Sequence, residues 1–95
     1  MAAFVITEVE ITNPEVYGQF VQQVTPTVEA HGGKFVARGG AIDIILGGWS
    51  PKRIAIMEFG SVDQVRTWLS SPEYTALTEM RESSANINMV VVEGL

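Results

Sequence analysis

The chain has 95 residues, the size of one domain (residues 1–95), and 46% of them are hydrophobic, which is enough for a core. Its formal net charge is −5 and no run of four basic residues occurs, so we expect no binding to nucleic acid, whose phosphates an acidic surface repels. The lack of cysteine and the single histidine exclude disulfides, thiolate chemistry and histidine-rich metal clusters, and we expect neither a metal nor a cofactor.

The N-terminal segment does not resemble a signal peptide, because it lacks basic residues and Glu8 interrupts its apolar stretch. No apolar run approaches the roughly 18 residues that a membrane-spanning helix requires. These features predict a cytoplasmic protein that does not associate with membranes.

The first third of the chain reads as a strand followed by a helix. Ala3–Ile11 is rich in β-branched residues that alternate between two faces, which is typical of a strand. Asn13-Pro14 combines a good N-cap with a proline at the first helical position, and apolar residues recur every four positions from Val16. We expect Pro26 to kink this helix or split off its last turns, and His31-Gly32-Gly33 to end it.

The middle of the chain contains two further strands separated by glycine-rich segments. Lys34–Arg38 is predicted to be a strand that Gly39-Gly40 breaks, and Arg53–Phe59 is the clearest strand because its residues alternate regularly. Between them, Ala41–Leu46 is predicted to pair as a short extra strand or to serve as a flap.

The last third predicts a pair of helical segments and a final strand. Ser61 opens the first helix with a capping box, and Ser71-Pro72 starts the second. Asn86–Val92 alternates as a strand. The order strand, helix, strand, strand, helix pair, strand fits a ferredoxin-like α+β fold, in which an antiparallel sheet carries its helices on one face.

The strands carry apolar residues on both faces, although the helices of such a fold cover only one. In the third strand Ile54 and Ile56 lie opposite Met57 and Phe59. An antiparallel sheet with a solvated face has polar residues there, so we expect a second layer on this face. A symmetric partner is the simplest source of that layer, and we predict a homodimer packed sheet to sheet.

Several segments along the chain form a set of motifs: Pro14-Glu15-Val16-Tyr17, Ala30-His31-Gly32-Gly33-Lys34-Phe35, Arg38-Gly39-Gly40, Gly48-Trp49-Ser50-Pro51, Arg53–Phe59, Trp68–Tyr74, Arg81 and Val92-Glu93-Gly94. Taken together, these motifs are similar to those of a family of small bacterial proteins, domain of unknown function 1330. This family belongs to the dimeric α+β barrel superfamily, together with the antibiotic biosynthesis monooxygenases. The resemblance covers essentially the whole chain and implies a dimer of ferredoxin-like subunits, but it implies no established reaction. One departure is Val65-Arg66-Thr67, where the family usually has alanine.

Two residues are candidates for catalysis. His31, at the predicted end of the long helix, is either a general base or ligand-binding group, or a C-cap whose ring hydrogen-bonds the last carbonyls. Glu58 lies within an apolar strand, where a carboxylate is costly unless it is paired. We expect an arginine as its partner, in a structural ion pair or in a pocket. The possible partners are Arg38, Arg53 and Arg81.

Four residues are candidates for binding a substrate. Arg38 ends a strand before two glycines, where an anion can approach the backbone. Arg81 shares a helix face with Tyr74, so it can meet Glu58 or a substrate carboxylate, while the Tyr74 hydroxyl can reach a pocket edge. Trp49 lies in a loop and is interpreted as a pocket lid or as a hydrophobic plug or dimer contact.

Two functions remain open on these residues. The first is binding of a small organic molecule between sheet and helices, with or without cofactor-independent monooxygenase-like or isomerase-like chemistry. The second is a non-catalytic dimeric module, structural or regulatory, in which the polar residues only maintain the fold.

Overall fold

The helices and strands follow one another in the order that the sequence predicts, except that the second member of the predicted helix pair is divided into two short helices. The computed structural model describes residues 1–95. The strands are β1 (Ala3–Ile11), β2 (Lys34–Arg38), β3 (Ile54–Phe59) and β4 (Ala85–Glu93), and the helices are α1 (Pro14–Ala30), α2 (Val62–Ser70), α3 (Pro72–Thr75) and α4 (Thr78–Ser84).

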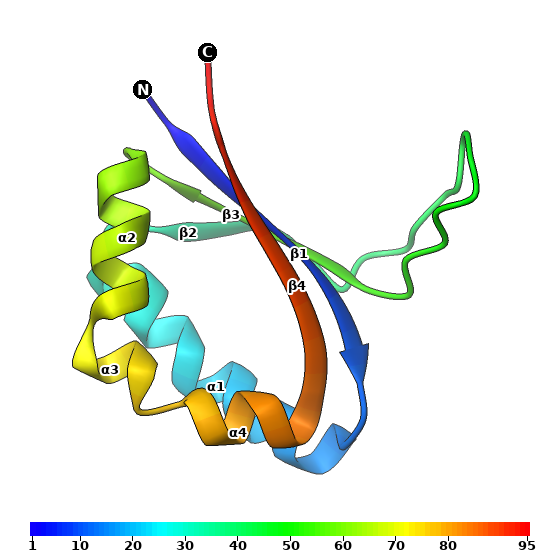
Figure 1. Cartoon of the computed structure of the whole chain (residues 1–95), viewed down its shortest axis with the longest axis horizontal. Coiled ribbons are helices and arrows are strands. Elements are labelled where there is room, and N and C mark those ends of the chain that lie inside the picture. Colours follow the sequence, from blue (N-terminus) through cyan, green and yellow to red (C-terminus); the bar gives the residue numbers. More distant parts are fainter.

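The four strands form one antiparallel sheet in the order β2-β3-β1-β4. The long strands β1 and β4 curve side by side, and all the helices lie on one face of the sheet (Figure 1). This is the ferredoxin-like α+β arrangement that the sequence predicts. No helix is both long enough and apolar enough to cross a membrane.

The predicted alternation fixes which side chains meet the helices. Val5 of β1 pairs with Met57 of β3, and both face the helices with exposures of 0% and 4%. Their neighbours along the strands, such as Ile6 and Ile56, point to the other face and are half-buried. Since side chains alternate with a period of two, this strand register places one set of side chains against the helices and the other set on the uncovered face of the sheet.

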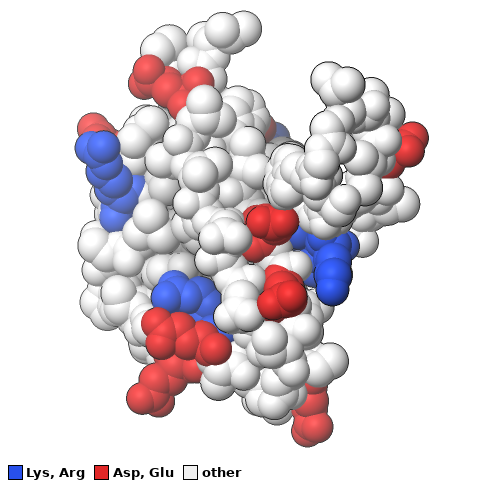
Figure 2. Space-filling model, turned by 45° about the vertical axis from the view of Figure 1, so that its right-hand side comes forward, with Lys and Arg blue, Asp and Glu red and all other residues white.

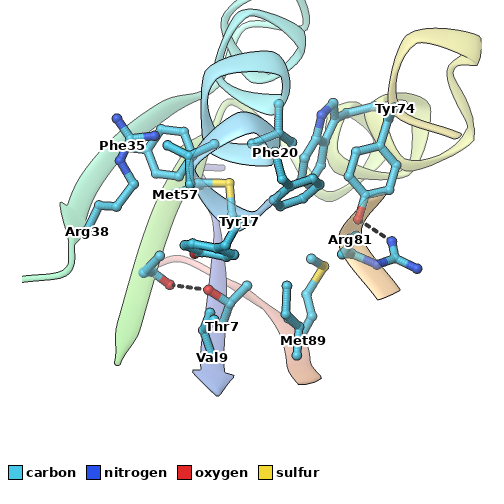
Figure 3. A pocket seen from close by; sticks show the side chains of 15 residues that line it. Thr7, Val9, Tyr17, Phe20, Phe35, Arg38, Met57, Tyr74, Arg81 and Met89 are labelled. Carbon is cyan, nitrogen blue, oxygen red and sulfur yellow. Dashed lines mark hydrogen bonds between the residues drawn. The ribbon is translucent and has the colours of Figure 1, made fainter. Parts of the chain in front are cut away.

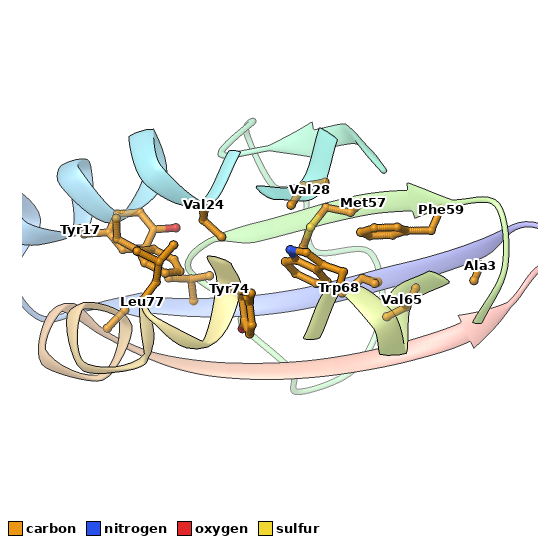
Figure 4. Close-up of a cluster of buried hydrophobic side chains, with 14 residues drawn as sticks. Ala3, Tyr17, Val24, Val28, Met57, Phe59, Val65, Trp68, Tyr74 and Leu77 are labelled. Carbon is orange, nitrogen blue, oxygen red and sulfur yellow. The ribbon is translucent and has the colours of Figure 1, made fainter. Parts of the chain in front are cut away.

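Trp68 of α2 is the centre of the core (Figure 4). It is 1% exposed, and its ring centroid lies 5.3 Å from that of Phe59 and 4.6 Å from that of Tyr74. Its indole Nε1 donates a hydrogen bond of 3.0 Å to Oγ1 of Thr27 on α1. The contact holds α2 against α1 and the sheet.

Helix α1 runs unbroken through Pro26, so the predicted split of its last turns does not occur. Proline removes one backbone donor inside a helix. On either side of it, the hydroxyls of Thr25 and Thr27 donate 2.7 Å hydrogen bonds to the carbonyls of Val21 and Val24. Neither bond replaces the one that Pro26 removes, and the helix continues because its apolar face, with Val24 and Val28, is packed into the core.

The segment between β2 and β3, residues 39–53, forms no strand and projects from the body of the protein (Figure 1). Of the two predictions for Ala41–Leu46, the extra strand is therefore wrong. Apolar side chains in the segment face solvent, with Ile45 83% and Leu46 91% exposed. In the space-filling view the projection is a mostly uncharged lobe (Figure 2).

Candidate functional site

A cavity lies between the helix-covered face of the sheet and the helices (Figure 3). The centre of a water-sized sphere can occupy about 50 Å³ of it, and the whole hollow, including the part open to solvent, measures about 470 Å³. Of its 15 lining residues, 12 are hydrophobic. They are Thr7, Val9, Tyr17, Phe20, Val21, Val24, Phe35, Arg38, Ala55, Met57, Trp68, Tyr74, Arg81, Ile87 and Met89.

The floor of the cavity is a pair of small residues in the middle of the sheet. Thr7 of β1 lies directly opposite Ala55 of β3, and both face the helices. The Thr7 hydroxyl donates a 3.0 Å hydrogen bond to the Ala55 carbonyl, so its proton is already used. The next pair along these strands, Val5 with Met57, is larger and closes that side. The cavity therefore begins where the central strand pair carries its smallest side chains.

Tyr74 and Arg81 form a polar end of this cavity. Nη1 of Arg81 donates a 2.8 Å hydrogen bond to the Tyr74 hydroxyl, and the guanidinium carbon lies 5.7 Å from the centroid of the tyrosine ring. Tyr74 is 6% exposed, and the Arg81 side chain is 26% exposed. The predicted shared face of these residues is confirmed, although it is built by two short helices, α3 and α4, rather than by one.

Arg38 lies across the cavity from Arg81 (Figure 3). Its register partner is Ala55, which places it on the helix-covered face of the sheet. Its guanidinium carbon lies 3.9 Å from the centroid of the Phe35 ring, and its Nη1 donates a 2.8 Å hydrogen bond to Oγ1 of Thr25. Arg38 thus stands at the exposed rim of the cavity, stacked on an aromatic wall.

His31 does not line the cavity. Its Nδ1 lies 2.9 Å from the carbonyl oxygen of Thr27, and its Nε2 lies 3.7 Å from a carboxylate oxygen of Glu73. The side chain is 19% exposed. These are contacts of the capping kind that its position at the end of α1 predicts, and they also connect α1 to α3.

Glu58 lies on the opposite face of the sheet from the cavity, and the expected arginine partner is wrong. Its carboxylate is 3.8 Å from Nζ of Lys34, which lies directly opposite in the β2–β3 register. Arg38 and Arg53 are on the other face: Arg38 pairs with Ala55, and the Arg53 guanidinium lies over Tyr17. The Glu58 side chain is 34% exposed, so the ion pair is partly solvated.

Trp49 is also remote from the cavity within this chain. It is 59% exposed, and its Nε1 donates a 2.9 Å hydrogen bond to a carboxylate oxygen of Glu8. Glu8 points to the face of the sheet that the helices leave uncovered. The bond fastens the projecting segment to that face.

Sequence reasoning missed two parts of the cavity. Phe35 forms the aromatic wall below Arg38, and the small pair Thr7 and Ala55 forms the floor. The sequence signal for this floor was Thr7, a polar residue among the otherwise apolar helix-facing positions of β1. The lining as a whole contains no aspartate, glutamate, histidine or lysine. The lining can therefore donate hydrogen bonds and balance negative charge, but it contains no carboxylate, imidazole or amine to act as a base.

The fold and this cavity define a ferredoxin-like α+β protein with an apolar chamber between sheet and helices. The chain belongs to the family described as domain of unknown function 1330 (DUF1330), whose model matches residues 2–95. The resemblance seen in the sequence is thus confirmed. A comparison with curated proteins finds no significant match.

Solved structures share the fold over nearly the whole chain. A protein of unknown function from Rhodopseudomonas palustris has a TM-score of 0.81 at 18% identity, covering 99% of this chain and 82% of that one. A dabb family protein with a ferredoxin-like fold from Mesorhizobium loti has a TM-score of 0.72 at 12% identity, covering 99% and 97%. SnoaB, a cofactor-independent oxygenase from Streptomyces nogalater, has a TM-score of 0.72 at 9% identity, covering 99% and 93%. At these identities the likeness establishes the fold.

Proposed function

We propose that the protein binds a small, largely apolar organic molecule in the cavity between sheet and helices. The observation that carries this proposal is an open apolar chamber beside the central strand pair of a short chain. Protein cores are close-packed, and a small domain that leaves such a space unfilled gives up part of its limited packing energy. A concave, mostly apolar pocket with few polar groups is the usual form of a small-molecule site.

The test is to fill the cavity from its floor. Ala55→Leu adds a larger side chain beside Thr7, so it should abolish binding of aromatic probes that stabilise the wild-type protein in a thermal-shift screen. Ala76→Leu makes the same chemical change at an exposed position and should leave binding unaltered. Probe binding that survives Ala55→Leu unchanged, with Ala76→Leu as the reference, contradicts the proposal.

The proposed function extends to a chemical conversion of the bound molecule. The S. nogalater protein with the same fold is described as a cofactor-independent oxygenase, and we propose that chemistry of this kind, or an isomerisation, also suits this cavity. The lining can stabilise negative charge through Arg38, Tyr74 and Arg81 but contains no carboxylate or imidazole. The substrate must therefore ionise readily without a protein base. Consumption of oxygen in the presence of an identified ligand measures this directly.

We also propose that the protein is a homodimer packed through the uncovered face of the sheet. That face carries half-buried Ile6 and Ile56, together with Val90 and Val92, which are 60% and 50% exposed. A dimeric ferredoxin-like protein from Thermobifida fusca has a TM-score of 0.63 at 13% identity, covering 97% of this chain and 90% of that one. Such an apolar face and this likeness support a second copy as its cover.

Light scattering coupled to size-exclusion chromatography tests the assembly. The wild-type protein should elute at twice the mass of the chain, and Val90→Glu should elute as a monomer, because each subunit would bring an unpaired carboxylate into an apolar interface. Ala76→Glu adds the same charge at an exposed position that follows α3 and should remain a dimer. A monomeric wild-type protein at micromolar concentration contradicts the proposal.

A further inference from the structure

We propose that the cavity selects an organic acid, with an apolar ring system in the chamber and an anionic group at the end formed by Tyr74 and Arg81. This inference rests on the proposed binding function and names the chemical class of the ligand.

The first argument is the direction of the hydrogen bond between Arg81 and Tyr74. The guanidinium donates and the hydroxyl oxygen accepts at 2.8 Å, so the phenolic hydrogen remains free to donate elsewhere. Arg81 makes no other side-chain hydrogen bond within the protein, so its remaining N–H groups are also available. The two side chains therefore place unused donors at one end of an apolar chamber, and an anionic oxygen is the natural complement of such donors.

The second argument is the charge around the cavity. The protein is acidic overall, with 11 acidic and 6 basic residues, yet none of its carboxylates lines the cavity. Arg38 has no carboxylate within 4.0 Å, and neither does Arg53, whose guanidinium carbon lies 5.6 Å from the centroid of the Tyr17 ring. The nearest acid to Arg81 is Glu82, at 3.8 Å, and its side chain is 68% exposed. A partner so solvated neutralises Arg81 only weakly.

A purely structural role predicts something different for these arginines. Each one lies near an aromatic ring of the cavity wall: Arg38 by Phe35, Arg53 by Tyr17 and Arg81 by Tyr74. If these arginines only packed on the rings by cation–π contacts, they would shield the chamber from solvent, and the chamber would show no preference for the charge of a ligand. The available donor on Tyr74 distinguishes the two roles, because a site built from donors discriminates against a ligand that lacks the matching acceptor.

The experiment compares two probes of nearly the same shape, 1-naphthoate and neutral 1-naphthamide, by isothermal titration calorimetry. We expect 1-naphthoate to bind the wild-type protein about tenfold more tightly or better, since a charge-assisted bond is stronger than a neutral one. Arg81→Met keeps the apolar stem and should remove this preference, whereas the affinity for 1-naphthamide should change little. Tyr74→Phe keeps the ring, removes the free donor and should reduce the preference in part.

The control is Arg66→Met, which makes the same substitution and the same change in net charge on an arginine that is 76% exposed and outside the cavity. It should leave both affinities unchanged. An equal loss of 1-naphthoate binding in Arg66→Met and Arg81→Met would mean a general effect of charge and would overturn the assignment. Equal binding of the two probes to the wild-type protein overturns the preference for acids but leaves the binding function standing. Failure of both probes to bind counts against both proposals.

Discussion

The hydroxyl of Thr27 joins two helices, and its removal gives the sharpest test of how the core is held. This oxygen donates to the Val24 carbonyl at 2.7 Å and accepts the indole N–H of Trp68 at 3.0 Å. Thr27→Val keeps nearly the same shape but leaves the indole donor without an acceptor, in a side chain that is 1% exposed. An unpaired buried donor costs about 1–3 kcal/mol. We therefore expect the free energy of unfolding to fall by about 2 kcal/mol, a large part of the 5–15 kcal/mol typical of a domain.

The assay is urea unfolding followed by circular dichroism at one fixed protein concentration, on a double-mutant cycle with Trp68→Phe. In the Trp68→Phe background no indole donor remains to be orphaned, so Thr27→Val should cost at least about 1 kcal/mol less there. Thr67→Val is the matched control, because its exposed hydroxyl only donates to the Asp63 carbonyl within α2 at 3.0 Å. It should stay within about 0.5 kcal/mol of wild type. An equal cost of Thr27→Val in both backgrounds would refute this reasoning.

Four further predictions concern two glycines, in and after α1, and the two candidates outside the cavity. Gly33→Ala should lower the free energy of unfolding by about 1–3 kcal/mol in urea, because its Cβ would lie 2.6 Å from the Phe59 ring. Gly18→Ala, in α1 with nothing within 4 Å of the added carbon, should raise it by roughly 0.5–1 kcal/mol. His31→Ala removes the 2.9 Å contact to the Thr27 carbonyl and should cost about 1 kcal/mol in the same assay, without altering probe affinity. Glu58→Gln should leave the calorimetric affinity for 1-naphthoate within about twofold of wild type, because Glu58 lies on the other face of the sheet.

Local features of the sequence predicted most of the fold. The caps at Asn13, Ser61 and Ser71 each accept the backbone N–H three residues later, as the sequence indicates. The alternation in β3 correctly separates Met57 from Ile56. These predictions succeed because each depends on neighbours within a few positions.

The site was harder to predict from the sequence, because it depends on pairs of residues that are far apart along the chain. The Lys34 partner of Glu58 follows from the β2–β3 register, and a shift of that register between Phe35 and Ala37 places Arg38 opposite Ala55. A strand bulge of this kind alters which residues lie opposite one another, and the spacing of apolar residues does not reveal it. The small floor of the cavity likewise requires knowing that Thr7 pairs with Ala55, 48 positions away.

The proposed ligand cavity and the proposed dimer surface lie on opposite faces of the sheet. In β1, Thr7 faces the cavity while its neighbours Ile6 and Glu8 face the surface proposed to meet a second copy. The cavity lies between the sheet and the helices, on the opposite side of the sheet from this surface. A Val90→Glu variant that elutes as a monomer should therefore bind 1-naphthoate with wild-type affinity. If binding is lost when the copies separate, while circular dichroism shows an intact fold, the partner must supply part of the site, and the exposed Trp49 is then the first residue to substitute.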